Sequence, residues 1–284
     1  MNPRTIFAFL FLSISASIAQ QDRPKIFTVD ELASAVVFLV QEKPETLKQQ
    51  GEEFEVWLKK VGSQQFVPKT QRITGTAFLL STDENLYLVI ASHVAKQMTS
   101  NALAFLRGSK DEPIKFSLTD LAGVGARNWK LHPEADVAVL LLQPSPTVLA
   151  TYLQKRFLPS YALEDTLKPP SRDLPLTVVG FPFGLGTEEH FSPLTQQTRA
   201  SSGLLRLNRF DNGVLSTFFI CENPSIGGYS GAPCFDVSIY KLGAMTSTGN
   251  GTKCYGIMHG TLSDQTGGKL AAVVPSKFIL DLIK

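Results

Sequence analysis

The sequence predicts an all-β protein made of two small antiparallel barrels, and three observations lead to this prediction. Short runs of β-branched and apolar residues, separated by turn residues, begin at Ile73 and continue almost to the end of the chain. A proline-rich passage over residues 143–176 divides these runs into two groups of similar size, and proline cannot take a central place in a sheet. Helical periodicity is scarce, and no fixed-period repeat indicates a solenoid or a propeller.

The first group of predicted strands makes up the first barrel, which covers residues 73–142. Each stretch has the length of a strand and is bounded by turn residues, as in a small antiparallel barrel. The apolar stretches are 73–81, 86–91, 103–106, 114–118 and 137–142.

The residues before this barrel, 20–72, are expected to form an N-terminal extension with the first strand or strands. Thr28 and Glu31 have the spacing of a capping box in front of an apolar stretch, and residues 35–40 are equally good strand material. We therefore expect a short helix that runs into a first strand. Apolar and polar residues alternate over 53–61, which predicts another strand of the first barrel.

The second barrel and a terminal helix are predicted for residues 177–284, after an inter-barrel linker over 143–176. At the end of the chain, Ser276 can cap a short helix whose apolar side chains share one face, so that it can pack on a barrel. The apolar stretches of this barrel are 177–181, 204–207, 217–221, 234–236, 254–258 and 270–274, and the helix face consists of Phe278, Ile279, Leu282 and Ile283.

Residues 1–19 have the pattern of a secretory signal peptide. Arg4 supplies the positive start, residues 6–18 are apolar or small, and 17–19 form a small-residue cleavage site. The mature chain is then expected to begin at Gln20, in a secreted or periplasmic location. A membrane anchor is the alternative, but the uninterrupted apolar run is far shorter than the roughly 20 residues that span a bilayer. No later stretch is long and apolar enough either, so we expect no stable membrane anchor.

The composition is that of a compact globular protein, with 43% hydrophobic and 18% charged residues among 284. The 27 basic and 25 acidic residues give a net charge of +2, which falls to +1 when the signal and its single arginine are removed. Such a balance predicts neither nucleic acid nor an anionic membrane as a partner.

Three cysteines, Cys221, Cys234 and Cys254, lie in the last quarter of the chain. In an exported protein cysteines can form disulfides, and one of the three must stay unpaired within a monomer. Cys234 and Cys254 lie on what should be neighbouring strands, so a disulfide between them is plausible and would leave Cys221 free. No metal site is expected, because there is no Cys-x-x-Cys and His259 has no second histidine at ligand-like spacing.

The sharpest local feature is the run Gly227-Gly228-Tyr229-Ser230-Gly231, which Ala232 and Pro233 close. Glycines permit positive φ angles and let a substrate carbonyl approach main-chain N–H groups. A nucleophilic serine needs this setting, since the amides of Gly228 and Ser230 can converge on the oxyanion that forms when the hydroxyl attacks a carbonyl. The alternative is an ordinary glycine-rich turn with an exposed serine.

A serine hydroxyl is a poor nucleophile at neutral pH, so a base must take its proton, and histidine is the natural side chain. Of the four histidines, His93 ends an apolar strand, where its ring can sit at the rim of a barrel. His132 and His190 lie in polar or proline-flanked loops, and His259 follows a later strand. We therefore expect His93 to be the base.

A carboxylate must fix the histidine tautomer and stabilise the imidazolium, and Asp136 is the candidate. It stands at the entrance of the apolar strand 137–142, which would bury its charge unless a partner such as His93 is present. A solvated aspartate at the start of a strand is the alternative.

With these residues the chain resembles the trypsin-like, chymotrypsin-fold serine peptidases, in particular the bacterial branch that includes the HtrA and glutamyl endopeptidase groups. The resemblance runs from about residue 73 to the end and implies two six-stranded antiparallel β-barrels with a short C-terminal helix. Its four main segments occur in the family's order: Gly75-Thr76-Ala77-Phe78, Ala91-Ser92-His93, Ala135-Asp136-Val137-Ala138-Val139-Leu140 and Gly228-Tyr229-Ser230-Gly231-Ala232-Pro233. Two further stretches match the second barrel, Val179-Gly180-Phe181-Pro182-Phe183-Gly184 and Tyr255-Gly256-Ile257-Met258.

The resemblance implies a role for each matching residue. His93 would be the general base, Asp136 its orienting partner and Ser230 the nucleophile that forms an acyl-enzyme, with the amides of Gly228 and Ser230 as the oxyanion hole. Protein or peptide substrates follow, and no cofactor is implied. The matching pocket residues are Pro224, Gly227, His259 and Thr261.

Several positions depart from the family pattern. Tyr229 stands where animal digestive members have an aspartate that pairs with a new N-terminus, so no zymogen switch of that type is expected. Ala232 replaces a more usual glycine. Pro224 carries no charge, so a strict preference for Arg or Lys has no support, while His259 could contact an acidic substrate side chain or be a structural residue.

Three functions compete at this stage. The first is a secreted serine endopeptidase, and the second is an inactive or partner-activated homologue that works as a binding module. The third is an esterase of the α/β-hydrolase type, which the residue order His, Asp, Ser and the lack of a closing glycine at Ala232 oppose. The chain ends soon after the second barrel, so no PDZ-like domain is expected.

Overall fold

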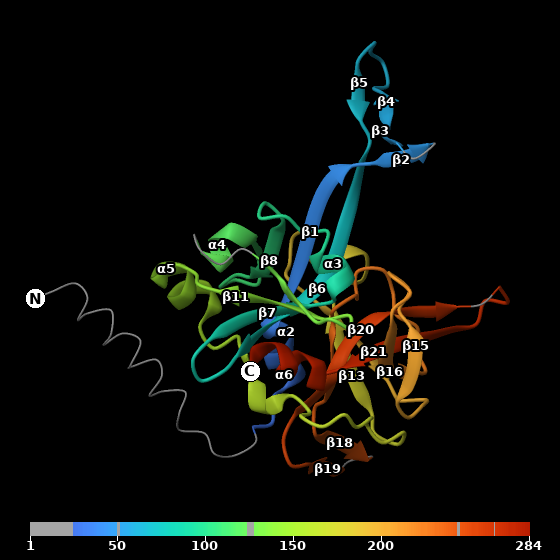
Figure 1. Cartoon of the computed structure of the whole chain (residues 1–284). Helices are drawn as coiled ribbons and strands as arrows, with labels where there is room; N and C mark the ends of the chain where they lie inside the picture. Colours follow the sequence, from blue (N-terminus) through green and yellow to red (C-terminus); the bar gives the residue numbers. More distant parts are fainter. Residues whose placement is uncertain (1–24, 50–51, 124–127, 243–244, 264) are drawn as a thin grey trace, which may run out of the picture.

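The computed structural model describes residues 25–49, 52–123, 128–242, 245–263 and 265–284. The predicted signal over 1–19 and its cleavage point at Gln20 lie outside the described residues. Two antiparallel sheets form the body of the molecule, a short helix ends the chain, and a narrow arm projects from the body (Figure 1). The predicted all-β fold class is therefore confirmed. No helix among the described residues is long and apolar enough to cross a membrane.

The first sheet has eight strands, all antiparallel to their neighbours except β12 (Leu158–Pro159), which pairs in parallel with β6. Six of the strands match the predicted number, and the other two, β10 and β12, are two-residue additions at its periphery. In order across the sheet the strands are β10 (Lys130–Leu131), β11 (Ala138–Leu142), β7 (Leu86–Ile90), β6 (Thr70–Ser81), β1 (Val36–Pro44), β8 (Leu103–Arg107) and β9 (Pro113–Ser117).

The start of this sheet follows the predicted helix-to-strand pattern. Helix α2 (Val29–Ala35) begins at Thr28, whose hydroxyl accepts from the Glu31 N–H while the Glu31 carboxylate accepts from the Thr28 N–H. Strand β1 follows without a loop and pairs along its whole length with β6. The capping box therefore sets where the helix begins.

The second sheet has seven strands, and one of them was not predicted. Strand β14 has the polar sequence Leu-Thr-Gln-Gln-Thr and lies at the edge of the sheet, so it lacks the apolar alternation that marks a strand. In order across the sheet the strands are β14 (Leu194–Thr198), β13 (Leu176–Gly180), β17 (Pro233–Asp236), β20 (Lys253–Ser263), β21 (Lys269–Pro275), β16 (Leu215–Cys221) and β15 (Leu205–Asn208).

The helices are short, as expected. Helix α6 (Lys277–Ile283) ends the chain and buries Ile279 and Leu282, whereas the hydroxyl of Ser276 donates to the Glu164 carbonyl and caps no helical N–H. The remaining helices are α3 (Ser92–Ala95), α4 (Leu118–Ala122) and α5 (Pro146–Val148), the last continuing into a π-helical turn at Leu149–Leu153 in the linker.

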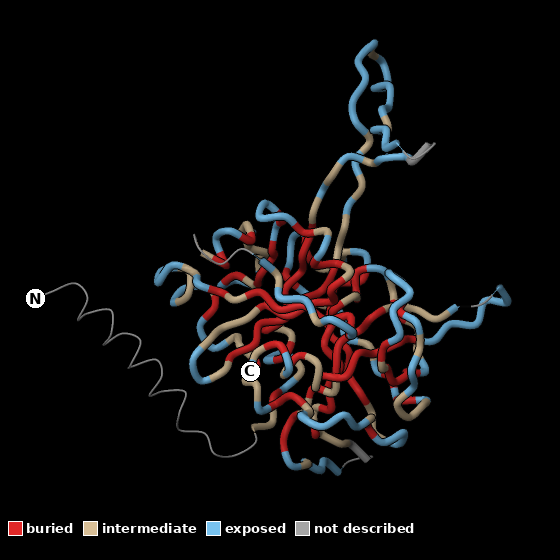
Figure 2. The backbone as a smooth tube through the Cα atoms, in the orientation of Figure 1, coloured by how far each residue is buried: buried red, intermediate tan, exposed pale blue. Residues whose placement is uncertain are grey.

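The arm lies outside both sheets. It continues from β1 and β6 and consists of two separate ribbons, β2 (Thr46–Gln49) with β3 (Glu52–Glu55) and β4 (Trp57–Lys59) with β5 (Phe66–Pro68). Among the residues of the two ribbons whose burial is described, all are exposed (Figure 2). The prediction that residues 53–61 add a strand to the first barrel is therefore wrong, because these residues pair only within the arm. A third ribbon, β18 (Ile239–Leu242) with β19 (Met245–Thr248), projects from the second half of the chain.

The three cysteines are free and buried. The predicted Cys234–Cys254 pair is wrong, since Cys254 lies opposite Phe235 rather than Cys234 across β17 and β20. Adjacent side chains of a strand point to opposite faces. Accordingly, Cys254 packs in the apolar cluster between the two sheets, whereas Cys234 packs with Cys221 in the cluster of the second sheet. Burial raises the pKa of Cys254 to about 12, so its thiol stays protonated.

Candidate active site

His93 and Asp136 are brought together by the pairing of β7 with β11. Ala138 lies opposite Ile90 in this ladder, so Asp136, just before β11, faces the chain that leaves β7. That chain turns at once into helix α3, which places His93 in its first turn. As a result the His93 main-chain N–H donates to Asp136 Oδ1 at 2.9 Å, and His93 Nδ1 lies 2.6 Å from Asp136 Oδ2.

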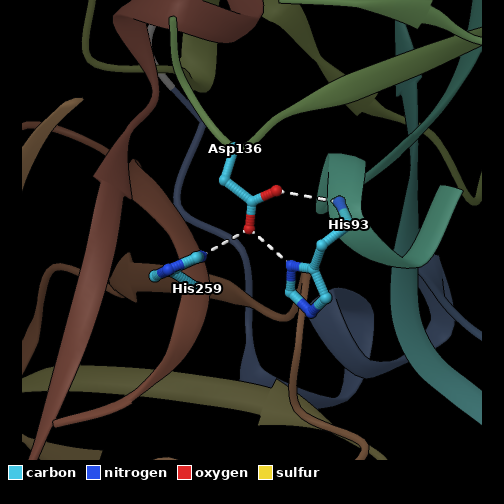
Figure 3. Close-up of side chains that lie close together, drawn as sticks. All are labelled: His93, Asp136 and His259. Carbon is cyan, nitrogen blue, oxygen red and sulfur yellow. Dashed lines mark hydrogen bonds and ion pairs between the residues drawn. The ribbon is translucent and has the colours of Figure 1, made fainter. Parts of the chain in front are cut away.

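Asp136 is the centre of the site. Its carboxylate is fully buried and accepts five hydrogen bonds, three of which appear in Figure 3. Oδ1 accepts from Ser92 Oγ at 2.7 Å, from the His93 N–H and from Arg209 Nη2 at 2.9 Å. Oδ2 accepts from the Nδ1 atoms of His93 and His259, at 2.6 and 2.5 Å. A buried carboxylate with this many donors is stable only as the anion.

The pKa of Asp136 reflects two opposed effects. Burial alone would raise the pKa of this carboxyl, since it disfavours the charged form. The hydrogen bonds from His259 and His93 outweigh burial and hold the pKa of Asp136 well below its ordinary value of 3.8. Asp136 therefore stays ionised over the whole neutral and mildly acidic range.

The hydrogen bonds fix the tautomer of both histidines. A carboxylate can only accept, so Nδ1 carries the proton in His93 and in His259. The main-chain N–H of Phe210 donates to His259 Nε2 at 3.3 Å, which makes that nitrogen an acceptor and the ring neutral. In neutral His93 the Nε2 atom is likewise the unprotonated one. Because 23% of the His93 side chain is exposed, its ring is not sealed from solvent.

His259 is an inner partner of Asp136 and not a wall of a substrate pocket. Its ring is buried and stacks between Phe210 and Phe218, at centroid distances of 4.7 and 5.0 Å. Both ring nitrogens have hydrogen-bond partners within the chain. This burial and pairing favour the structural interpretation of the ring over contact with a substrate side chain.

Arg209 is a member of the site that sequence reasoning missed. It lies at the tip of the hairpin that joins β15 to β16, and 2% of its side chain is exposed. Its guanidinium donates to Asp136, to Ser92 Oγ at 2.8 Å and, through Nε and Nη2, to both carboxylate oxygens of Asp211. Two acids share one arginine, so with neutral histidines the cluster keeps one net negative charge. No sequence signal marks this residue, since an arginine beside a turn is usually exposed.

The loop that carries Ser230 is held by both sheets. From the first sheet, the Thr76 N–H donates to the Ser230 carbonyl at 3.0 Å, and Thr76 Oγ1 donates to the Gly228 carbonyl at 2.7 Å. From the second, the Met258 carbonyl accepts from the Gly231 N–H at 2.8 Å. Gly228 and Gly231 have φ angles of 99° and 90°, which favour glycine. A Cβ on Gly231 would lie 2.3 Å from the Thr76 carbonyl oxygen.

Two amide groups of this loop are available to a ligand. The Gly227 carbonyl accepts from the Phe183 N–H at 2.7 Å. Because a trans peptide is planar, the Gly228 N–H of the same unit points the opposite way. Neither the Gly228 N–H nor the Ser230 N–H donates to any group in the described part of the chain.

The Ser230 hydroxyl donates to the main-chain carbonyl of His259 at 3.3 Å. Within the described residues no hydrogen bond joins it to His93. The ring of His93 in turn lies edge-on to the ring of His259, with 5.6 Å between centroids. Ser230 and His93 therefore flank the same residue, from the loop and from helix α3. The structure forms the expected contact between His93 and Asp136, while Ser230 contacts the main chain of His259, whose ring contacts Asp136.

The other residues expected in a pocket lie in the segment before Ser230 and near the end of β20. Thr261 Oγ1 donates to the Ser225 carbonyl at 2.5 Å and so joins the end of β20 to the segment before the serine. In that segment Gly227 is exposed, and the Pro224 carbonyl accepts from Gln196 Nε2 at 3.3 Å.

Tyr229 and Ala232, which depart from the family pattern, are packing residues. Both are buried in the cluster of the second sheet, and Tyr229 is 2% exposed. A Cβ on Gly180 would lie 2.8 Å from the Tyr229 ring and 3.0 Å from the Ala232 Cβ, so the glycine leaves the room they need. Ala232 does not crowd the loop.

The ligand atoms of His93, Asp136 and His259 lie within 4.8 Å of one another, which invites comparison with a metal centre. The chemistry does not fit a cation. Both Nδ1 atoms carry protons that Asp136 accepts, and the guanidinium of Arg209 already lies 2.9 Å from Oδ1. We therefore interpret the cluster as a hydrogen-bonded charge network.

Replacing Thr76 by valine is expected to destabilise the loop of Ser230. Its hydroxyl donates to Gly228 and accepts from the Phe181 N–H at 3.0 Å, and the residue is fully buried. Valine keeps the shape but leaves two buried main-chain groups unpaired, which should lower the free energy of unfolding by about 2 kcal/mol. Urea unfolding checks this value, with the exposed Thr70→Val as the control. Equal midpoints for the two variants would contradict the role given to Thr76.

Comparisons with known proteins agree with the architecture. No family model and no curated protein matches the sequence. Among solved structures, the active form of the Rv3671c protease from M. tuberculosis is 15% identical and covers 92% of this chain and 86% of its own, with a TM-score of 0.51. Deg5 is also 15% identical, covering 89% and 88%, with a TM-score of 0.46. The likeness to the M. tuberculosis protease, the two antiparallel sheets and the short C-terminal helix together give this chain the chymotrypsin-like protease fold.

Proposed function

We propose that this protein is a secreted serine endopeptidase that uses His93, Asp136 and Ser230 as its catalytic triad. The observation that carries the proposal is the Asp136 network. It buries an ionised carboxylate against His93, fixes the proton on Nδ1 and leaves Nε2 as an acceptor. A chain with no catalytic use for His93 has no need of that arrangement on this fold.

In the proposed reaction Ser230 Oγ attacks the carbonyl carbon of a peptide bond while its proton passes to His93 Nε2. The free N–H groups of Gly228 and Ser230 donate to the oxyanion. The imidazolium, stabilised by Asp136, then gives its proton to the departing amine as the C–N bond breaks. Water then attacks the ester carbonyl while His93 takes its proton. His93 returns this proton to Ser230 Oγ as the ester C–O bond breaks, which releases the acid product and restores Ser230. Before this reaction the Ser230 hydroxyl must turn from the His259 carbonyl and donate to His93 Nε2 instead.

His259 and Arg209 are given a supporting role in this proposal. Each donates to a different oxygen of Asp136, so the carboxylate cannot rotate away from His93.

Pro224 and Thr261 would border the substrate side chain before the cut bond, and neither carries a charge. We therefore expect uncharged side chains to be accepted there. Export through the segment 1–19 completes the proposal.

Labelling with a fluorophosphonate probe tests the proposal, because the probe reacts only with an activated serine. The chain from Gln20 onward should be labelled, and mass spectrometry should place the adduct on Ser230. Ser230→Ala should abolish labelling, while Ser247→Ala, a change in the exposed ribbon of β19, should leave it intact. Labelling of Ser230 without cleavage of any peptide in a library would exclude the endopeptidase and favour ester substrates.

A binding module is the second candidate, and one observation favours it. The Ser230 hydroxyl is bonded to the His259 carbonyl, and the contact with His93 is not formed. If folded protein shows no labelling of Ser230 at any pH between 5 and 9, the endopeptidase proposal fails and this reading replaces it.

A further inference from the structure

The far end of the arm is the most exposed apolar region of the molecule. We call residues 56–69 the arm tip; it contains the ribbon of β4 and β5 and the turn between them, and Figure 1 shows it at the point farthest from the body. Its large apolar side chains are exposed by two fifths to the whole of their surface. They are Trp57 (52%), Leu58 (49%), Val61 (100%), Phe66 (60%) and Val67 (43%).

These side chains lie on both faces of the ribbon. Trp57 pairs with Pro68 and Lys59 with Phe66, and these share one face because adjacent side chains alternate. Leu58 pairs with Val67 on the other face. Neither face packs on the body of the protein (Figure 2). A two-stranded ribbon of this kind has marginal stability on its own.

The arm tip is also basic. It contains Lys59, Lys60 and Lys69 and no acidic residue, which gives it a charge of +3. Lys69 lies at its base, where the ammonium group pairs with Glu45 at 2.9 Å, so Lys59 and Lys60 are the lysines that lie nearest the turn. The whole chain has a net charge of +2, so everything outside the arm tip carries −1. The even overall balance therefore hides a local excess of positive charge at the end of a projecting element.

This combination fits a lipid surface better than a protein partner. A protein partner would cover one face of the ribbon and leave the other exposed to solvent. Insertion of the ribbon between lipid headgroups would bury both faces. Tryptophan and phenylalanine favour the interfacial layer, and lysine can bury its stem while its ammonium group reaches the phosphates. The ribbon edges have unpaired main-chain groups, which restricts insertion to the interface.

The second ribbon of the arm limits how far the arm tip can enter. Between the tip and the body, β3 carries Glu52, Glu53 and Glu55. An anionic surface repels these carboxylates and attracts the lysines beyond them. The charge order along the arm thus favours contact through the tip alone.

We propose that the arm tip docks this protein reversibly onto the surface of an anionic lipid bilayer. One ribbon combines three features that are typical of a reversible peripheral anchor. These are exposed aromatic side chains, apolar residues on both faces and an excess of lysine. The proposal is independent of the catalytic one, since no residue of the arm takes part in the Asp136 network. It differs from the expectation drawn from the net charge of the whole chain, because that charge does not show where the lysines lie.

Vesicle flotation of the chain from Gln20 onward tests this docking. Vesicles of phosphatidylcholine with 30% phosphatidylserine should carry the protein, and vesicles of phosphatidylcholine alone should carry far less. Lys59→Gln with Lys60→Gln should lower the partition coefficient roughly 30-fold, because each lysine near such a surface contributes about 1 kcal/mol. Trp57→Ser with Leu58→Ser should lower it at least as much. The matched control, Leu167→Ser with Lys168→Gln, alters exposed residues of the linker and should change nothing.

The fluorescence of Trp57 distinguishes docking through the arm tip from binding through another part of the protein. The chain has two tryptophans, so Trp129→Phe leaves Trp57 as the single reporter. Its emission should shift to the blue on anionic vesicles and return at high salt. Equal flotation of the arm variants and the parent would overturn the proposal. The proposal would also be overturned if sedimentation showed a dimer of the parent that Trp57→Ser dissociates. In that case a second copy of the chain would cover the arm tip.

Discussion

Replacing Asp136 by asparagine is expected to lower kcat/KM for a peptide substrate by about 10⁴-fold. The carboxylate accepts from five donors, and asparagine keeps its shape but turns one acceptor into an NH₂ donor. If the NH₂ faces the two imidazoles, His93 must place its proton on Nε2, which removes the base. If it faces the other side, it opposes Arg209 and Ser92. Either orientation leaves the imidazolium without its counter-charge.

Steady-state kinetics on a peptide from a library screen measure this loss, and Asp165→Asn, an exposed acid of the linker, is the control. Acid stability gives an independent readout. Because the pKa of Asp136 is lowered in the folded chain, its stabilising contribution is present above the ordinary value of 3.8 and is lost as the pH falls below it. The asparagine variant should lack that part of the acid transition. Activity within tenfold of the parent would remove Asp136 from the mechanism.

The body of the fold was predictable because its strands are buried. Strands β7 and β11 and the end of β6 are rich in Leu, Val, Ile and Phe, because most of these residues are buried. Burial leaves a strong signal in the sequence. Strand β14 lies at an edge and has a polar sequence, so burial leaves no such run there. In the arm the alternation over 53–61 indicates a strand, but it does not indicate which segment pairs with it.

The site was predictable only where local order determines it. His93 follows an apolar strand, Asp136 precedes one, and Ser230 stands among glycines, so chain position alone made these residues candidates. Arg209 and the ring of His259 meet Asp136 through contacts between the two sheets, at separations of 73 and 123 residues. The cysteine pairing failed for a related reason, because a β-bulge and the choice of sheet face at Cys254 depend on register.

Replacing Arg209 by methionine is expected to lower the free energy of unfolding by about 3–5 kcal/mol, which is the usual effect of removing one partner from a buried ion pair. Methionine has similar length and can fill the space, so the effect reports charge rather than a cavity. It leaves Asp136 buried with two neutral imidazoles and Asp211 without its partner. Urea unfolding measures the change. Arg206→Met, on the same hairpin but exposed, should cost less than about 0.5 kcal/mol.

Two companion variants separate charge from geometry at this position. Arg209→Lys keeps the positive charge but cannot bridge two carboxylates with a planar fork, so it should recover only part of the lost stability. Asp211→Asn should restore part of the stability of Arg209→Met, because it removes one of the two unpaired acids. A loss in Arg209→Met no larger than in Arg206→Met would mean that Asp136 is stabilised by the histidines alone. In that case the hairpin of β15 and β16 could be changed without disturbing the site. The network described above predicts instead that Arg209 and Asp136 must be kept together in any redesigned chain that retains the proposed activity.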